Sequence, residues 1–381
     1  MSNSFDVLIF GTGPAGSATA LALLQAGITR VGLVGRTARP EWQIGESAPP
    51  ELNHLVCALG LSHDLQALGH SPCHGNVSAW GRAVHVHDFL RNGLGNGWHL
   101  DRAAFDAWLL RAAVQRGATV INARRLEVVS RDVDRGWAVT LCHDGGPLQL
   151  SAAVIVVATG RAAASALRFQ ARTHRVDQLV ALAAVSPINS NVFMPGYSLI
   201  EAIELGWWYS APLPGGKRIT VLMTDKNLVR KHSLLNKERF LALLSGTRLL
   251  RSFVPESSEA VDAIKTFPAA TQYRDRAAGA RWFAVGDALV AFDPLTSAGI
   301  SGALNDARNV AGTITKILSG ASADEMRDLA FAHAERANRM LTSFLSERGR
   351  IYGQETRWPN SAFWRSRTGA IPDVGPIGPL R

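Results

Sequence analysis

The sequence predicts an α/β protein in which a Rossmann-like domain is interleaved with a second domain built on a mixed β-sheet, followed by a helical C-terminal segment. Three observations predict this fold class. A buried strand, a glycine-rich turn and a helix open the chain. A short apolar strand and a Gly-Asp loop return near residue 286. Between them lies a region of strand-like runs and aromatic, proline-rich loops.

The opening elements form a βαβ unit. We expect a buried strand over Phe5–Phe10 and a helix over Ser17–Ala26, which is rich in small residues. Gly27 ends this helix, and Val31–Val34 begins a second strand. The order and the length of these elements are typical of a βαβ unit.

Later elements alternate between the two domains. We expect a helix over Leu100–Arg116, capped by Asp101, and a buried parallel-type strand over Val154–Ala158. Residues 1–165 and 272–320 are assigned to the first domain, with residues 70–98 contributing to the substrate side. A substrate domain covers residues 166–271, and a C-terminal helical segment and tail cover residues 321–381.

Composition excludes several classes of protein. With 381 residues and 47% apolar residues the chain can bury a large core. The net charge is +9, but there is no run of five basic residues, so we expect no nucleic-acid partner. The three cysteines show no metal-site or disulfide spacing. No signal peptide and no apolar stretch long enough for a membrane span are predicted, so we expect a cytoplasmic protein.

The turn after the first strand has the sequence GTGPAG. Gly11 allows the tight turn, Gly13 lets the backbone approach a pyrophosphate, and Gly16 allows the helix to pack closely on the strand. Pro14 and Ala15 lie in the same turn, and the N–H groups at the start of the helix favour phosphate binding. Because the motif lies between a strand and a helix, it predicts a dinucleotide cofactor.

The acidic residue that usually follows such a loop is absent. About 20 residues after the turn, an Asp or Glu normally binds the adenosine ribose. Here the chain has Val34-Gly35-Arg36, and we expect Arg36 to lie against the adenine or a phosphate. This departure weakens NAD binding more than FAD binding, because FAD is held by many other contacts.

The second constellation is GDALVAFDPLTSAGI at residues 286–300. After Gly286, the Asp287 carboxylate can accept hydrogen bonds from ribityl hydroxyls. The chain bends from Pro294, and N–H groups at Gly299 and Ile300 can face the pyrimidine edge of a flavin, where negative charge develops on reduction. Both constellations therefore suit one cofactor, FAD.

These motifs carry a family resemblance over most of the chain. The chain resembles the FAD-dependent monooxygenase superfamily of the aromatic-hydroxylase type. Within it, the chain is most similar to the branch containing tryptophan halogenases and the flavoprotein maturases of quinone-cofactor amine oxidases and dehydrogenases. The matching segments are the two glycine loops, IGESAPP, WHLDRAAFDAWL, GWWYSAPLP and ETRWPNSAFWRSR.

The resemblance implies roles for individual residues. Glu46 and Ser47 of the GES segment are implied to lie near the flavin ring, and Arg102 is implied to reach the FAD phosphates or adenine. The alternative for Arg102 is an ion pair with Asp106, four residues along the helix. Asp287 is implied to bind the ribityl chain, and residues 294–300 to line the isoalloxazine.

Departures from the family pattern bear on the reaction. Single-component hydroxylases carry an Asp-Gly pair where this chain has Thr159-Gly160, so reduced flavin is expected from a separate reductase. Halogenases need a lysine beyond the GES segment, and this chain has none before Lys217. Their W-x-W-x-I-P segment is also altered. Halogenation is therefore disfavoured, and the resemblance implies hydroxylation, in which O2 and reduced flavin form a C4a-hydroperoxide.

Several groups are candidates for the reaction itself. Glu46 and the histidines between His70 and His99 are candidate acids or bases. His85 and His87 share a strand face, which we interpret as a plain strand surface without a metal. Trp208 and its neighbours either line the substrate pocket or pack under a loop. We count Glu46, Trp208 and Pro294 as catalytic-site residues.

Three functions are open at this stage. The first is hydroxylation of a tryptophan in a partner protein, an amine oxidase or dehydrogenase precursor, during tryptophylquinone cofactor biogenesis. The second is a small-molecule hydroxylase or halogenase of natural-product biosynthesis. The third is a flavin-binding assembly factor without turnover.

Overall fold

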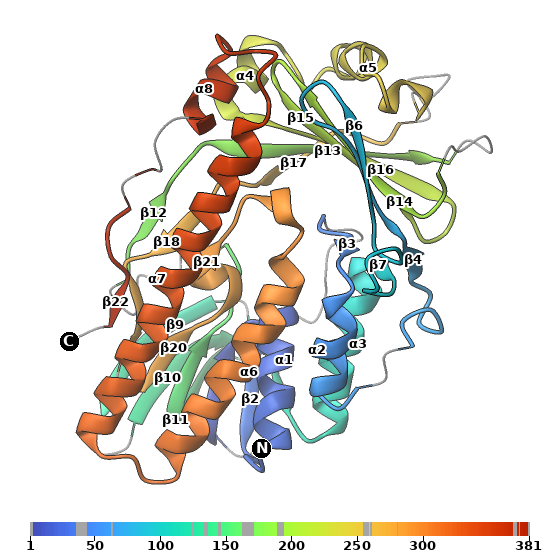
Figure 1. Cartoon of the computed structure of the whole chain (residues 1–381). Coiled ribbons are helices and arrows are strands. Elements are labelled where there is room, and N and C mark those ends of the chain that lie inside the picture. The colour runs from blue at the N-terminus through green and yellow to red at the C-terminus, as the bar shows by residue number, and fades with distance from the viewer. Residues whose placement is uncertain are drawn as a thin grey trace.

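A computed structural model describes residues 3–35, 44–61, 64–123, 125–132, 136–143, 146–161, 171–188, 194–253, 259, 261–279, 281–368, 372 and 374–379. Two large sheets lie one above the other in Figure 1, and the long helix α7 (Ala323–Gly353) runs beside both. The predicted α/β fold with two sheets and a helical C-terminal segment is confirmed. Among the described residues, no helix is long and apolar enough to cross a membrane.

The lower sheet in Figure 1 has a parallel centre. Strands β20, β11, β1, β2 and β8 are neighbours in that order, and each pairs parallel with the next. The nine strands of the sheet are β1 (Ser4–Phe10), β2 (Val31–Gly35), β8 (Thr119–Asn122), β9 (Arg125–Asp132), β10 (Gly136–His143), β11 (Gly146–Val157), β19 (Arg276–Gly279), β20 (Trp282–Ala284) and β22 (Gly378–Pro379). The carboxyl ends of the parallel strands form one edge, where α/β proteins bind their ligands.

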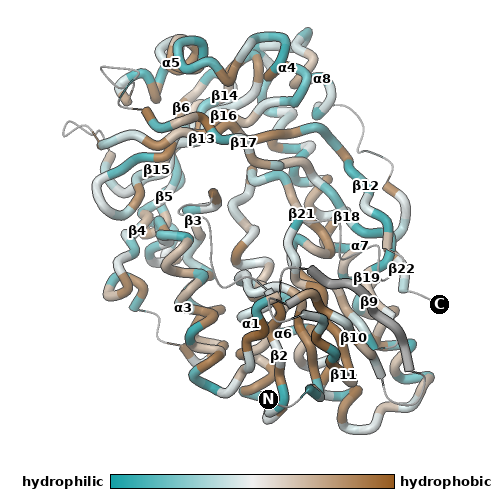
Figure 2. The backbone as a smooth tube through the Cα atoms, turned by 180° about the vertical axis from the view of Figure 1, so that it is seen from behind, coloured by the Kyte–Doolittle hydropathy of each residue, from teal (hydrophilic) through white to brown (hydrophobic). Residues whose placement is uncertain are grey.

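The upper sheet is mixed. Its order is β17 (Lys265–Pro268), β13 (Leu179–Pro187), β16 (Lys217–Asp225), β15 (Gly206–Leu213), β14 (Tyr197–Ile203), β5 (Gly75–Ala79) and β6 (Val84–Asp88). Its inner face packs against Leu295 and Tyr352. Its outer face packs against Phe240 of α5. Figure 2 shows hydrophobic residues concentrated in the strands of both sheets.

Strand β6 is an edge of the upper sheet. It pairs with β5 alone among the described strands, and the register of this pairing is uninterrupted. Residues 84–87 are all exposed, and the Val86 side chain is 54% exposed. Parallel pairing of β5 with β14 brings residues 75–88 into the same sheet as residues 179–268.

The remaining elements connect the two sheets. Two small sheets contain β12 (Thr173–Arg175), β18 (Gln272–Arg274) and β21 (Val290–Ala291), and β3 (Ser47–Ala48), β7 (Gly97–His99) and β4 (Ser71–Cys73). The helices other than α7 are α1 (Pro14–Gln25), α2 (Glu51–Ala58), α3 (Arg102–Gln115), α4 (Lys226–Lys231), α5 (Lys237–Ser245), α6 (Gly299–Leu318) and α8 (Ala362–Thr368). Helix α1 begins at Pro14, earlier than predicted, because proline is well accommodated in the first turn.

Candidate functional site

The first glycine loop joins β1 to α1 at the carboxyl edge of the parallel sheet. Gly11 has a φ of 124°, and a Cβ there would lie 2.1 Å from the carbonyl oxygen of Ala158. A Cβ on Gly16 would lie 2.0 Å from the carbonyl oxygen of Gly11. Glycine is therefore required at both positions. By contrast, a Cβ on Gly13 would have no neighbour within 4 Å, so the backbone is open on that side.

The start of α1 suits a phosphate. Gly13 is the N-cap, and no side chain caps the helix. Pro14 and Ala15 form its first turn, so free N–H groups and the positive end of the helix dipole face the open space. This cradle fits the pyrophosphate of FAD.

The second glycine loop packs against the first. Gly286 has a φ of 57°, and a Cβ there would lie 3.0 Å from the Cβ of Ala15. The next side chain, Asp287, is partly exposed, and Arg161 Nε lies 3.3 Å from its Oδ2. Partial burial raises the pKa of Asp287, and the charges of Arg161 and Arg102 oppose that rise. Asp287 and Arg102 therefore lie at one site, although they are far apart in the sequence.

A loop of five residues, Asp293–Ser297, which we call the flavin loop, follows the second glycine motif. Pro294 begins a 3-10 turn that Asp293 caps, and Ser297 is left-handed with a φ of 51°. Helix α6 then starts at Gly299 and Ile300 without a side-chain cap. The site thus offers a second uncapped helix N-terminus, which fits the pyrimidine edge of a flavin.

Glu46, in the GES segment, is a buried carboxylic acid. Its side chain is 3% exposed, Oε2 accepts a hydrogen bond from Gly45 N at 3.0 Å, and Oε1 has no hydrogen-bond partner. Burial raises the pKa of Glu46 to about 7, despite the opposing charge of Arg102. Because its pKa is near neutral, Glu46 can hold or accept a proton under ordinary conditions.

Arg102 contacts its neighbour on α3 and the main chain of the GES segment. Its Nε lies 3.4 Å from Asp106 Oδ1, which confirms the ion pair along α3. Its NH1 also donates to the carbonyl oxygens of Ile44 at 2.8 Å and Gly45 at 3.3 Å. The guanidinium therefore borders the GES segment, and a contact with FAD phosphates stays a prediction.

Ser47 is the centre of a hydrogen-bonded cluster that the sequence alone did not reveal. Its Oγ lies 2.6 Å from Tyr209 Oη, 2.8 Å from Ser198 Oγ and 3.0 Å from His99 Nδ1. Burial lowers the pKa of His99 to about 4 and raises the pKa of Tyr209, so both groups are neutral near pH 7. Ser198 lacked any sequence signal, because only the register of β14 brings it there.

Trp208 is a correction to the sequence-based assignment. In β15 the side chains alternate, so Trp207 and Tyr209 face inward while Trp208 faces outward. Trp208 is fully buried, and its ring packs edge-on against Phe240 with centroids 4.8 Å apart. It lies on the opposite face of the sheet from Tyr209, which bonds Ser47, and this packing does not favour a catalytic role for Trp208.

Other predicted groups lie away from this site. His85 and His87 are exposed on the edge strand, and no cluster of metal ligands occurs among the described residues. Arg36 lies outside the described residues. The chain has six lysines; Lys237 donates to the carbonyl oxygen of Val261, and the others are exposed: Lys217, Lys226, Lys231, Lys265 and Lys316.

Comparisons with known proteins agree with this geometry. The protein LodB of Marinomonas mediterranea, named as an FAD-dependent oxidoreductase, is 30% identical over 367 residues, which cover 96% of this chain and 97% of LodB. The myxobacterial chondrochloren halogenase CndH has a similar structure, with a TM-score of 0.82 at 24% identity over 96% of this chain and 86% of that one. The peptidyl tryptophan dihydroxylase QhpG, essential for tryptophylquinone cofactor biogenesis, gives a TM-score of 0.77 at 24% identity over 98% and 80%.

The family described as "FAD binding domain" matches residues 4–343. The residues present fit the cofactor, because two uncapped helix starts, an open Gly13 and a partly exposed Asp287 line one edge of the sheet. The chain belongs to this FAD-binding family and is a flavin-dependent oxidoreductase with FAD as its cofactor.

Proposed function

We propose that the chain is a monooxygenase that hydroxylates the indole ring of a tryptophan in a partner polypeptide, an amine oxidase or dehydrogenase precursor. One observation carries the choice of hydroxylation. The polar groups gathered around Glu46 and Ser47 are a carboxylic acid and neutral hydroxyl and imidazole groups. Five of the six lysines are exposed, and Lys237 bonds Val261. Without an ammonium group to hold an oxidised halogen, halogenation is disfavoured.

The chain's own residues have the following roles in this proposal. The inner face of the upper sheet holds the aromatic ring over the flavin loop and excludes water. The Tyr209 hydroxyl, which is hydrogen-bonded to Ser47, donates a hydrogen bond to the reacting atoms. Glu46 holds or accepts one proton at Oε1. Bound FAD, once reduced by a separate reductase, supplies an activated oxygen atom from O2.

Asp287, Arg102 and the two helix starts bind FAD in this proposal. Pro294 and Ile300 place the flavin loop and the first turn of α6 against the ring system. The assignment of a polypeptide substrate draws support from the likeness to the peptidyl tryptophan dihydroxylase. The halogenase CndH has the same identity and a higher TM-score, 0.82 against 0.77, and the experiment below separates the two reactions.

The test uses the holoprotein, a flavin reductase, O2 and the purified precursor polypeptide of a quinone-cofactor oxidase. We expect the tryptophan-containing peptide to gain the mass of one oxygen atom or more, and Glu46→Gln to abolish most of that gain. Bromide in the same assay is expected to leave the product unbrominated.

Three outcomes would contradict the proposal. A brominated product would favour a halogenase. An unchanged precursor together with hydroxylation of free indoles would favour a small-molecule hydroxylase. An unchanged precursor whose cofactor still matures with Glu46→Gln and without flavin reduction would favour an assembly factor that does not turn over.

A further inference from the structure

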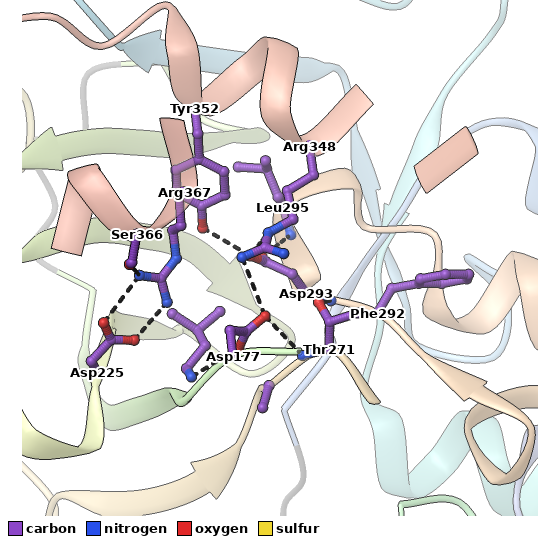
Figure 3. Close-up of polar contacts among 12 residues, drawn as sticks. Asp177, Asp225, Thr271, Phe292, Asp293, Leu295, Arg348, Tyr352, Ser366 and Arg367 are labelled. Carbon is purple, nitrogen blue, oxygen red and sulfur yellow. Dashed lines mark hydrogen bonds and ion pairs between the residues drawn. The ribbon is translucent and has the colours of Figure 1, made fainter. Parts of the chain in front are cut away.

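A cluster of buried charged groups lies where the C-terminal segment meets both domains (Figure 3). Helices α7 and α8 provide its cations and a phenol, and the two domains provide its carboxylates. The members are Arg348, Tyr352, Arg367, Asp177, Asp225 and Asp293. Asp293 is also the first residue of the flavin loop, so the cluster reaches the cofactor side of the molecule.

The two oxygens of Asp293 have different partners. Oδ1 accepts a hydrogen bond from Leu295 N at 3.1 Å and so caps the turn of the flavin loop. Oδ2 accepts a hydrogen bond from Tyr352 Oη at 2.8 Å, and Arg348 Nε lies 3.6 Å away. The rotamer that caps the loop is therefore held from the other side by α7.

Tyr352 connects the loop to the upper sheet. Its hydroxyl accepts a hydrogen bond from Trp207 Nε1 at 2.9 Å, and its side chain is fully buried. A single hydroxyl thus joins the inner face of β15 to Asp293. The path runs from Trp207 through Tyr352 to Asp293 and on to the main chain of Leu295.

Arg348 is shared between Asp177 and Asp293, so it cannot replace the Tyr352 hydroxyl as the hydrogen-bond donor to Asp293. Its NH2 lies 3.3 Å from Asp177 Oδ2, and Asp177 also accepts hydrogen bonds from the main chain of Leu179 and Thr271. Burial raises the pKa of Asp293, and the nearby charge of Asp177 raises it further. Asp177 and Asp293 share Arg348, and the charge of Arg367 also acts on Asp293. A neutral donor that bonds Asp293 Oδ2 directly stabilises this buried carboxyl group further.

Tyr352 lies beyond residue 343, where the match to the FAD-binding family ends. We propose that Tyr352 is a positioning residue, which sets the flavin loop against strand β15 and thereby fixes how the flavin sits relative to the substrate sheet. The inference rests on the placement of the flavin beside Pro294 that is proposed above. It does not depend on which reaction the flavin performs.

The test measures release of FAD from diluted holoprotein by the rise in flavin fluorescence. Tyr352→Phe keeps the ring but leaves Trp207 Nε1 and Asp293 Oδ2 each without a hydrogen bond. We expect FAD release about tenfold faster, as for the loss of a hydrogen bond to a charged group. The visible spectrum of the bound flavin is expected to shift. Asp293→Asn is expected to give a similar change, and the double variant is expected to be no faster than either single variant.

Trp364→Phe is the matched control. It removes a buried indole donor in the same C-terminal segment, bonded to the Ile203 carbonyl at 2.9 Å. The ring of Trp364 packs against Tyr352, with centroids 5.8 Å apart, and phenylalanine keeps an aromatic ring there without changing the hydrogen bonds of Asp293. The variant is expected to lower the unfolding midpoint and to leave FAD release unchanged. If Tyr352 had only a structural role, Trp364→Phe and Tyr352→Phe would change FAD release to the same extent. Wild-type release from Tyr352→Phe, equally fast release from Trp364→Phe, or additive effects in the double variant would overturn the proposal.

A second variant covers the case in which Tyr352→Phe yields no folded holoprotein. Trp207→Phe breaks the same path from the sheet side and leaves the bond between Tyr352 and Asp293 intact. Its FAD release is expected to be faster than that of wild type, and wild-type release would count against the proposal. Neither assay needs a substrate, so failure here and failure of the proposed hydroxylation are separate results.

Discussion

Glu46 combines deep burial with an unsatisfied oxygen, which is costly for an ionised carboxylate. Its pKa of about 7 expresses that cost, because burial favours the neutral acid. Such a group suits proton transfer at neutral pH but adds nothing to stability in its charged form. The sequence indicated this residue through the GES segment, yet its burial could be learned only from the fold.

The raised pKa predicts how stability depends on pH. Between pH 4.5 and about 7 the folded protein keeps a proton that Glu46 has lost in the unfolded chain. Stability from this residue is therefore highest below pH 4.5 and falls as pH rises through 7, by about 3 kcal/mol. Glu46→Gln is expected to remove this dependence in urea unfolding of the FAD-free protein. Parallel pH curves for the two proteins would show that the pKa is not raised.

Gly13 and Gly16 predict opposite outcomes for the same substitution. Gly16→Ala places a Cβ 2.0 Å from the Gly11 carbonyl oxygen and is expected to destabilise the fold by several kcal/mol. Gly13→Ala meets nothing within 4 Å and has an ordinary extended backbone, so stability without FAD should change little. Its FAD affinity is expected to fall at least tenfold, because the methyl group enters the phosphate space. Calorimetry of the FAD-free proteins and FAD titration check both expectations.

At the scale of single elements, the alternation of side chains along strand β15 determines which of its aromatic residues faces the site. Neighbouring aromatic residues of this strand lie on opposite faces, so one can reach the site and the other cannot. The sequence predicted this aromatic run to be a loop, whereas it forms strand β15, and it could not show which face of the strand α5 covers. The face is set by pairing with β14 and β16, whose positions depend on contacts far apart in the chain.

This alternation gives a matched pair of variants. Tyr209→Phe removes the hydroxyl that bonds Ser47, and we expect turnover on the precursor polypeptide to fall about 10²-fold. Trp208→Phe is expected to cost about 1 kcal/mol of stability and to keep turnover near that of wild type. Initial rates and unfolding midpoints of both variants test this, and equal rates for the two variants would argue against a role for the Tyr209 hydroxyl.

At the scale of the whole molecule, local signals predicted the cofactor half better than the substrate half. The glycine loops, the helix starts and the parallel strands all follow from patterns within about 15 residues. The cluster around Ser47 does not, because Ser198, Tyr209 and His99 meet through pairings among three separate segments. The same reason explains why the contact between Tyr352 and Asp293, which are 59 residues apart, could not be predicted from the sequence.

Strand β6 pairs on one side only among the strands that the structure describes, which affects the behaviour of the protein at high concentration. Phe89 N donates to the His74 carbonyl, so alternation directs the main-chain N–H and C=O groups of Val84 and Val86 away from β5. The strand has no lysine, proline or bulge to block another strand from pairing there. We expect reversible self-association through this edge, and Val86→Lys is expected to reduce it in light-scattering measurements while leaving FAD content unchanged. If the wild-type protein stays monomeric at high concentration, the prediction is wrong and the exposed edge of β6 does not pair with a second molecule.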